Sequence, residues 1–176
     1  MDFDVTSISA IVAAAGVLIG VAYYILDLRH NREAKEMELS RMVISDVQSE
    51  QGAQRWATIM NLEWKDYDDF ERKYGSDYNL DNYAKRFCVW ETYNTLGMLV
   101  REKLIEPEVL YRINDVNPCF MWSKFKDLIT ELTRRYGGGV SYSDFEFLNN
   151  EILRIALSKN PSFKIPETFM KYIPDK

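Results

Sequence analysis

The sequence predicts an all-α protein in which an N-terminal transmembrane helix continues into a cytoplasmic helical bundle. Residues 8–26 form an uncharged apolar run, and several later segments repeat apolar residues at the three- and four-residue spacing of a helix. No stretch of useful length has the alternating pattern of a strand. The 176 residues are 47% apolar and 14% aromatic, enough for one packed domain in addition to an anchor.

The apolar run from Ile8 to Leu26, ISAIVAAAGVLIGVAYYIL, is the predicted membrane span. Its 19 residues carry no charge, and as a helix they reach roughly 28 Å, close to the hydrocarbon thickness of a bilayer. Residues 1–7 contain two Asp and no basic residue, whereas residues 27–41 contain four basic residues. The positive-inside rule therefore predicts a single-pass protein of the cell membrane, with its N-terminus outside and its C-terminal domain in the cytoplasm.

Two other interpretations of the apolar run are a cleaved signal peptide and a buried core helix. A signal peptide carries basic residues before its apolar stretch, and residues 1–7 have none. A helix without a polar face suits a membrane better than a protein core. The lipid bilayer is therefore the first expected partner.

Small residues gather on one face of the predicted span. Ala13, Gly16 and Gly20 follow one another at helical spacing, with the two glycines forming a GxxxG pair. Small residues let two membrane helices approach closely. These three residues are the candidate contact for a homo-oligomer formed through the membrane helix.

The chain divides into five predicted segments: an extracytoplasmic N-terminus (1–7), the transmembrane helix (8–26), a charged helical stalk (27–38), the cytoplasmic helical bundle (39–160) and a Pro-containing tail (161–176). Residues 27–50 read as unbroken helix, with Gly52 as a weak point. Within the bundle, apolar periodicity and helix-ending residues predict the later helices. These are Asp66–Tyr74, about 80–104, about 107–114, about 118–136, and a last helix that Ser141 or Ser143 caps.

No group of residues predicts catalysis, a metal site or a cofactor. The only histidine is His30, and Cys88 and Cys119 lie among large apolar residues. The acidic run 66–71 lacks the spacing of a calcium loop, and no GKS or GKT follows the glycines at 137–139. The net charge of −5, without a basic stripe, argues against nucleic-acid binding. We therefore do not expect an enzyme.

The most apolar helix is interrupted by polar residues that form a candidate polar pocket. Glu91 and Asn94 need partners if they are buried, and Arg86 or Arg101 is the expected one. The pocket is assigned to Glu91, Asn94 and Arg101. The alternatives are an internal salt bridge and a position at the exposed edge of the helix.

One segment resembles a known family. Residues 90–111, WETYNTLGMLVREKLIEPEVLY, with Trp122, Phe125 and Leu128 after them, resemble a prokaryotic family of short single-span proteins known only as a domain of unknown function. The Leu-Gly-x-Leu-Val-Arg core of that family is here residues 96–101. The resemblance covers about residues 8–135 and implies a membrane helix with a helical domain, but no activity. The family often has Glu three residues before the Gly, where this chain has Asn94.

These features predict a membrane-tethered helical interaction or regulatory module with an unknown protein partner. The alternative is a small-ligand sensor that signals through associated membrane helices. The two differ in what they require of the domain. An interaction module needs an exposed apolar or charged patch, whereas a sensor needs an enclosed pocket near Glu91 and Asn94.

Overall fold

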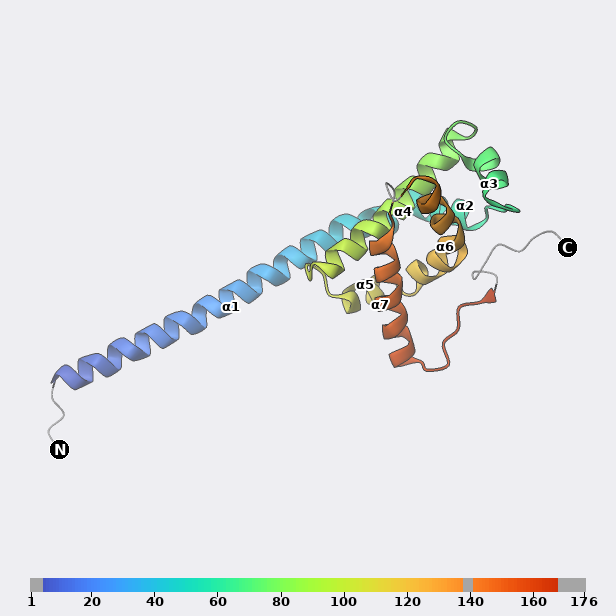
Figure 1. Cartoon of the computed structure of the whole chain (residues 1–176). Coiled ribbons are helices and arrows are strands. Elements are labelled where there is room, and N and C mark those ends of the chain that lie inside the picture. The colour runs from blue at the N-terminus through green and yellow to red at the C-terminus, as the bar shows by residue number, and fades with distance from the viewer. Residues whose placement is uncertain (1–4, 138–140, 168–176) are drawn as a thin grey trace. The chain divides into compact units, whose positions relative to one another are not determined.

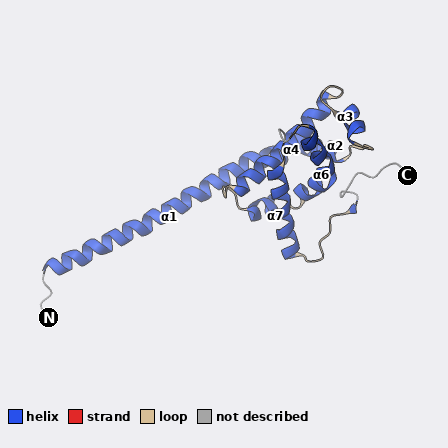
Figure 2. Ribbon diagram, viewed as in Figure 1, coloured by secondary structure: helices blue, strands red, loops and turns tan. Residues whose placement is uncertain are grey.

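The computed structural model describes residues 5–137 and 141–167 and is helical, with no strand in these ranges (Figures 1 and 2). The predicted all-α class is therefore confirmed. In chain order the helices are α1 (Val5–Val47), α2 (Glu50–Met60), α3 (Tyr67–Tyr74), α4 (Leu80–Arg101), α5 (Pro107–Asn114), α6 (Asn117–Arg135) and α7 (Ser143–Lys159). The predicted tail, 161–176, is described only as far as residue 167.

The chain divides into two compact units, Met1–Leu39 and Ser40–Lys176. The first consists, as far as it is described, of the N-terminal part of α1, and every residue from 16 to 31 is exposed. No helix in the described part of the chain has both the length and the apolar character needed to cross a membrane. The side chains of residues 8–15 of the predicted span lie outside the described residues, so the span stays a prediction.

The prediction of unbroken helix through residue 50 is wrong, because α1 ends at Val47 and α2 begins at Glu50. The Oγ of Ser49 accepts a hydrogen bond from the N–H of Gly52 at 2.9 Å, which makes Ser49 the N-cap of α2. Glu50 adds an acidic residue in the first turn, where the helix dipole favours it. The break therefore precedes Gly52, which is buried inside α2.

In the second unit α4 is the central helix, and its most extensive contact is with α7. Gly97 marks the closest approach, since a Cβ atom at this position would overlap the backbone carbonyl of Asp144 in α7. Only glycine lets the two backbones meet there. Tyr93 of α4 stacks on Phe145 of α7 one turn earlier, with ring centroids 5.1 Å apart. The predicted Leu-Gly-x-Leu-Val-Arg core is thus the α4–α7 joint.

A cluster of aromatic rings joins α3, α4 and α6. Phe125 of α6 is fully buried and lies 5.1 Å from the ring of Trp64 and 5.2 Å from that of Trp90. Trp64 also meets Phe70 of α3 edge to face at 5.2 Å. These ring contacts lie within the range that stabilises aromatic pairs. They fix the first half of α4, including Trp90, against α3 and α6.

The predicted helix ends agree with the structure at α3 and differ at α4 and α7. The helix predicted over Asp66–Tyr74 begins one residue later, because Asp66 is the N-cap of α3, and it ends at Tyr74 as predicted, with Gly75 after it. The helix predicted to run to about residue 104 ends earlier, at Arg101, because Lys103 takes a φ of 57° and turns the chain toward α5. The predicted serine cap of α7 is not formed: the N-cap position is Tyr142, whose side chain makes no capping bond.

Candidate functional site

A cavity of about 400 Å³ lies in the second unit, lined by residues of α3 and of α4 as far as Asn94, by the end of α6 and by the residues before α7. This volume is in the range of small-molecule sites. The lining residues are mostly aromatic or polar: Glu71, Ser76, Tyr83, Arg86, Phe87, Glu91, Asn94, Leu132, Tyr136, Ser141 and Tyr142.

Arg86 is the one basic residue of this lining, and it is buried, with only 5% of its surface exposed. Its guanidinium carbon lies 4.7 Å from the ring centre of Trp90, 5.0 Å from that of Phe70 and 5.2 Å from that of Tyr83. Burial lowers the pKa of Arg86, but an arginine side chain keeps its charge in a protein. The positive charge is therefore held among ring faces at the wall of the cavity.

Within the described ranges Arg86 has no polar partner in the chain. No ion pair there includes it, and no atom accepts a hydrogen bond from its buried Nε. A buried charge without a partner is expensive in free energy. Its presence on a cavity wall is typical of a site that binds an oppositely charged group.

Glu91 lines the cavity from the same helix, and Tyr142 lines it from the segment before α7. Burial and the nearby negative charge of Glu91 raise the pKa of the Tyr142 phenol. Tyr142 therefore stays protonated at neutral pH. The carboxylate is half-buried in the cavity wall.

Glu71 supplies a second carboxylate at the end of α3. Its side chain lies against Gly75, where an added Cβ atom would overlap the carboxyl group. The negative charge of Glu71 opposes the lowering of the Arg86 pKa. The cavity thus combines one guanidinium with two carboxylates and an aromatic wall.

Asn94 lines the cavity and also holds the first turn of α7. Its Oδ1 accepts a hydrogen bond from the backbone N–H of Phe145 at 3.1 Å. This N–H is one of the donors that a helix N-terminus leaves without a partner. Asn94 of α4 therefore supplies the capping oxygen that the sequence assigns to Ser141 or Ser143.

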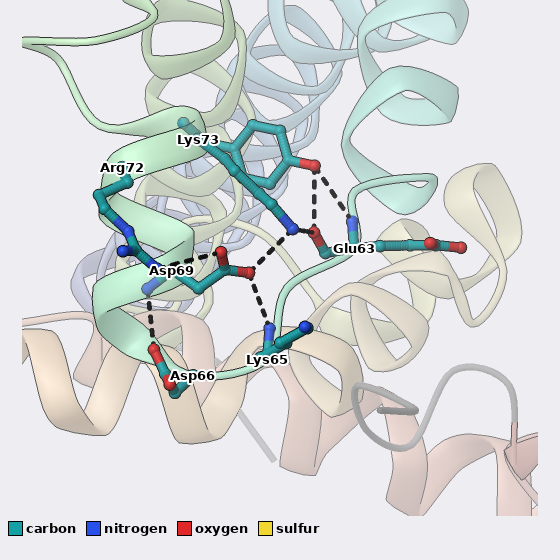
Figure 3. A network of polar contacts seen from close by, with 7 residues as sticks. Glu63, Lys65, Asp66, Asp69, Arg72 and Lys73 are labelled. Carbon is teal, nitrogen blue, oxygen red and sulfur yellow. Dashed lines mark hydrogen bonds and ion pairs between the residues drawn. The ribbon is translucent and has the colours of Figure 1, made fainter. Parts of the chain in front are cut away.

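The start of α3 is held by a local polar network, drawn in Figure 3. The Oδ1 of Asp66 accepts from the N–H of Asp69 at 2.8 Å, and Asp69 pairs with Lys73 at 2.8 Å. Asp69 also accepts from the N–H of Lys65 at 3.0 Å. The hydrogen bond from Lys73 is the main reason that the pKa of Asp69 is lowered. The acidic run thus caps and braces α3, which carries Glu71 to the cavity and Phe70 to the guanidinium of Arg86.

The structure brings together two of the three residues assigned to the polar pocket. Glu91 and Asn94 line the cavity, but Arg101 does not. Arg101 lies at the other end of α4, where its Nε donates to Asp144 Oδ1 at 2.6 Å. The cavity arginine is Arg86, the other partner considered from the sequence. One signal singles it out: Tyr83 and Trp90 lie three residues before and four after it, on the same helix face.

The remaining candidate residues lie elsewhere. Gly16 and Gly20 are exposed on α1 with open space around them, and the side chain of Ala13 lies outside the described residues. Cys119 is buried in the core, and burial raises the pKa of its thiol to about 12. Cys88 is exposed on α4. None of these residues lines the cavity.

Comparison with known proteins identifies the family. The family model described as Domain of unknown function (DUF4760) matches residues 10–152, and the chain belongs to this family. Among curated proteins and solved structures there is no significant match. The expected resemblance to a domain of unknown function is therefore confirmed, whereas the single membrane span and the prokaryotic origin stay predictions.

Proposed function

We propose that this member of the family is a membrane-tethered ligand-binding module whose cytoplasmic domain receives a small molecule in the cavity beside Arg86. The observation that carries this proposal is the cavity of about 400 Å³ in which Glu91, Asn94 and the buried Arg86 meet. Such a concave site, with a few converging polar groups on an aromatic wall, is the usual form of a small-molecule site. This favours the sensor over an interaction module without a ligand.

The membrane tether in this proposal is supported by the sequence. Residues 8–26 are uncharged and long enough for one bilayer crossing, and the basic residues follow them on one side only. The exposed Gly16 and Gly20 are available for contact between two such helices. Binding in the cavity would be transmitted if it changed how paired membrane helices associate.

A cavity-blocking variant tests ligand binding. Ser76 is an exposed lining residue, so Ser76→Trp places a bulky ring at the cavity, and Ser162→Trp adds the same ring at an exposed position away from it. The full-length chain, purified in mild detergent, is heated with the small-molecule fraction of a bacterial extract. We expect the fraction to raise the melting temperature of the wild type and of Ser162→Trp, but not of Ser76→Trp. Equal behaviour of all three proteins would refute ligand binding at this cavity.

A further inference from the structure

We infer that the ligand is a small zwitterion of the α-amino acid class with an apolar side chain, bound through its carboxylate to Arg86 and through its ammonium group to Glu91. This inference rests on the proposed function and names the chemistry of the same cavity. It follows from three properties of the wall: an unpaired guanidinium, two carboxylates and a set of aromatic rings.

The guanidinium requires an anion. Arg86 is 95% buried, since 5% of its surface is exposed, and its Nε has no acceptor among the described residues. The rings of Trp90 and Phe70, 4.7 and 5.0 Å from the guanidinium carbon, limit the orientation of its plane. A fixed guanidinium plane presents paired N–H donors that match the two oxygens of a carboxylate. A carboxylate is therefore the expected group at this end of the ligand.

The two glutamates disfavour a ligand that carries only negative charge. Glu71 and Glu91 line the same cavity as Arg86, so a simple anion would meet two like charges in a partly enclosed site. A ligand with an ammonium group as well as a carboxylate turns that repulsion into attraction. Glu91 is the proposed partner because Glu71 already acts on the charge of Arg86, whereas Glu91 lines the cavity further along α4.

Arg86 and Glu91 reach the same cavity from different sides of α4. They are five positions apart in the sequence, which is a rise of ~7.5 Å and a rotation of about 140° on a helix. Both side chains are long, and both reach the cavity. Their charged ends can therefore contact the two charged groups of one α-amino acid.

The rest of the wall selects the side chain of the ligand. Tyr83, Phe87 and Tyr136 present aromatic surface, and Leu132 adds aliphatic surface. The volume of about 400 Å³ exceeds what the charged end of an amino acid occupies. Beyond the charged groups the wall presents these rings beside the polar residues Ser76, Asn94 and Ser141. A large aliphatic or aromatic side chain gains the most from burial against the rings.

Calorimetric titration tests the ligand class with matched probes. The full-length wild-type chain in detergent is titrated with each of the twenty common L-amino acids, and with 3-phenylpropanoate and 2-phenylethylamine, which are phenylalanine without its amine and without its carboxylate. We expect at least one amino acid with a large apolar side chain, such as leucine or phenylalanine, to bind. Each phenylalanine fragment should bind at least about tenfold more weakly than phenylalanine, because it satisfies only one end of the site.

Single substitutions then separate the two charged contacts. Arg86→Met should abolish binding of the amino acid, and Glu91→Gln should reduce the preference for the amino acid over 3-phenylpropanoate. Arg101→Met is the matched control, since Arg101 does not line the cavity, and it should bind as the wild type does. Glu91 is only half-buried, so Glu91→Gln keeps the test decisive if Arg86→Met does not fold.

The outcomes distinguish this inference from the proposed function. If no amino acid binds, but the extract still stabilises the wild type and not Ser76→Trp, the cavity binds another class of ligand and this inference is wrong. If neither amino acids nor the extract have an effect, the proposed function fails as well. Binding by Arg86→Met with unchanged affinity would also overturn the role of Arg86.

Discussion

The two halves of α4 each carry an arginine, and the surroundings of the two charges differ. At the C-terminal end, Arg101 is 46% exposed and pairs with Asp144 at 2.6 Å, which joins α4 to α7. In the first half, Arg86 is buried among aromatic rings without an anionic partner in the described chain. The charge of Arg101 therefore stabilises the fold. The charge of Arg86 lowers the stability of the domain, and a destabilising residue of this kind is typical of a binding site.

The largest expected change in stability comes from a substitution near the C-terminal end of α4, where this helix contacts α7. Gly97→Ala should lower the free energy of unfolding by about 3 kcal/mol, because the new methyl group collides with backbone rather than with a side chain that can move. Urea unfolding followed by circular dichroism measures the loss. Thr95→Ala, at an exposed position of the same helix, should change stability by less than about 0.5 kcal/mol. A tolerated Gly97→Ala would mean that the two helices do not approach as closely as described.

Replacing Arg86 and replacing Arg101 should change the free energy of unfolding in opposite directions. Without ligand, Arg86→Met should raise the free energy of unfolding by about 1 kcal/mol, because removing an unpaired buried charge outweighs the loss of its ring contacts. Arg101→Met should lower it by up to about 1 kcal/mol, because it removes a partly exposed ion pair. Urea unfolding of both variants beside the wild type measures the difference. A loss of several kcal/mol in Arg86→Met would show that the domain itself stabilises this charge, and the reason to expect an anionic ligand would disappear.

The sequence predicts most of the fold because local chemistry sets most helix ends. Asp66, Gly75 and Pro107 act within one turn of their own positions, so their helices begin or end where the sequence predicts. The sequence does not predict the break at Ser49, because residues 27–50 contain no Gly or Pro and read as one helix. It does not predict the capping of α7 either, because the capping oxygen comes from Asn94, which is distant in the sequence.

The candidate site is likewise predictable only in part, because some of its residues stand out within one helix and others depend on tertiary packing. Glu91 and Asn94 stand out as polar residues in an apolar helix, and the structure places both at the cavity. Which arginine accompanies them depends on tertiary packing, because Phe70 of α3 and the Phe125 contact of Trp90 enclose Arg86. No pattern within α4 alone shows that Asp144 of α7 takes the other arginine.

The smallest expected effect comes from a third arrangement of arginines, an exposed one. Glu131 accepts hydrogen bonds from Arg134 and Arg135, which lowers the pKa of its carboxyl from 4.5 to about 2. Because the folded-state pKa is the lower one, this contribution to stability is present above pH 4.5 and is lost as the pH falls toward about 2. Glu131→Gln removes the titrating group, so its deficit in free energy of unfolding relative to the wild type should shrink over that interval. Urea unfolding at several pH values measures this. A deficit that stays constant down to pH 2 would mean that Glu131 stabilises the fold through packing, and that its hydrogen bonds to Arg134 and Arg135 contribute little through charge.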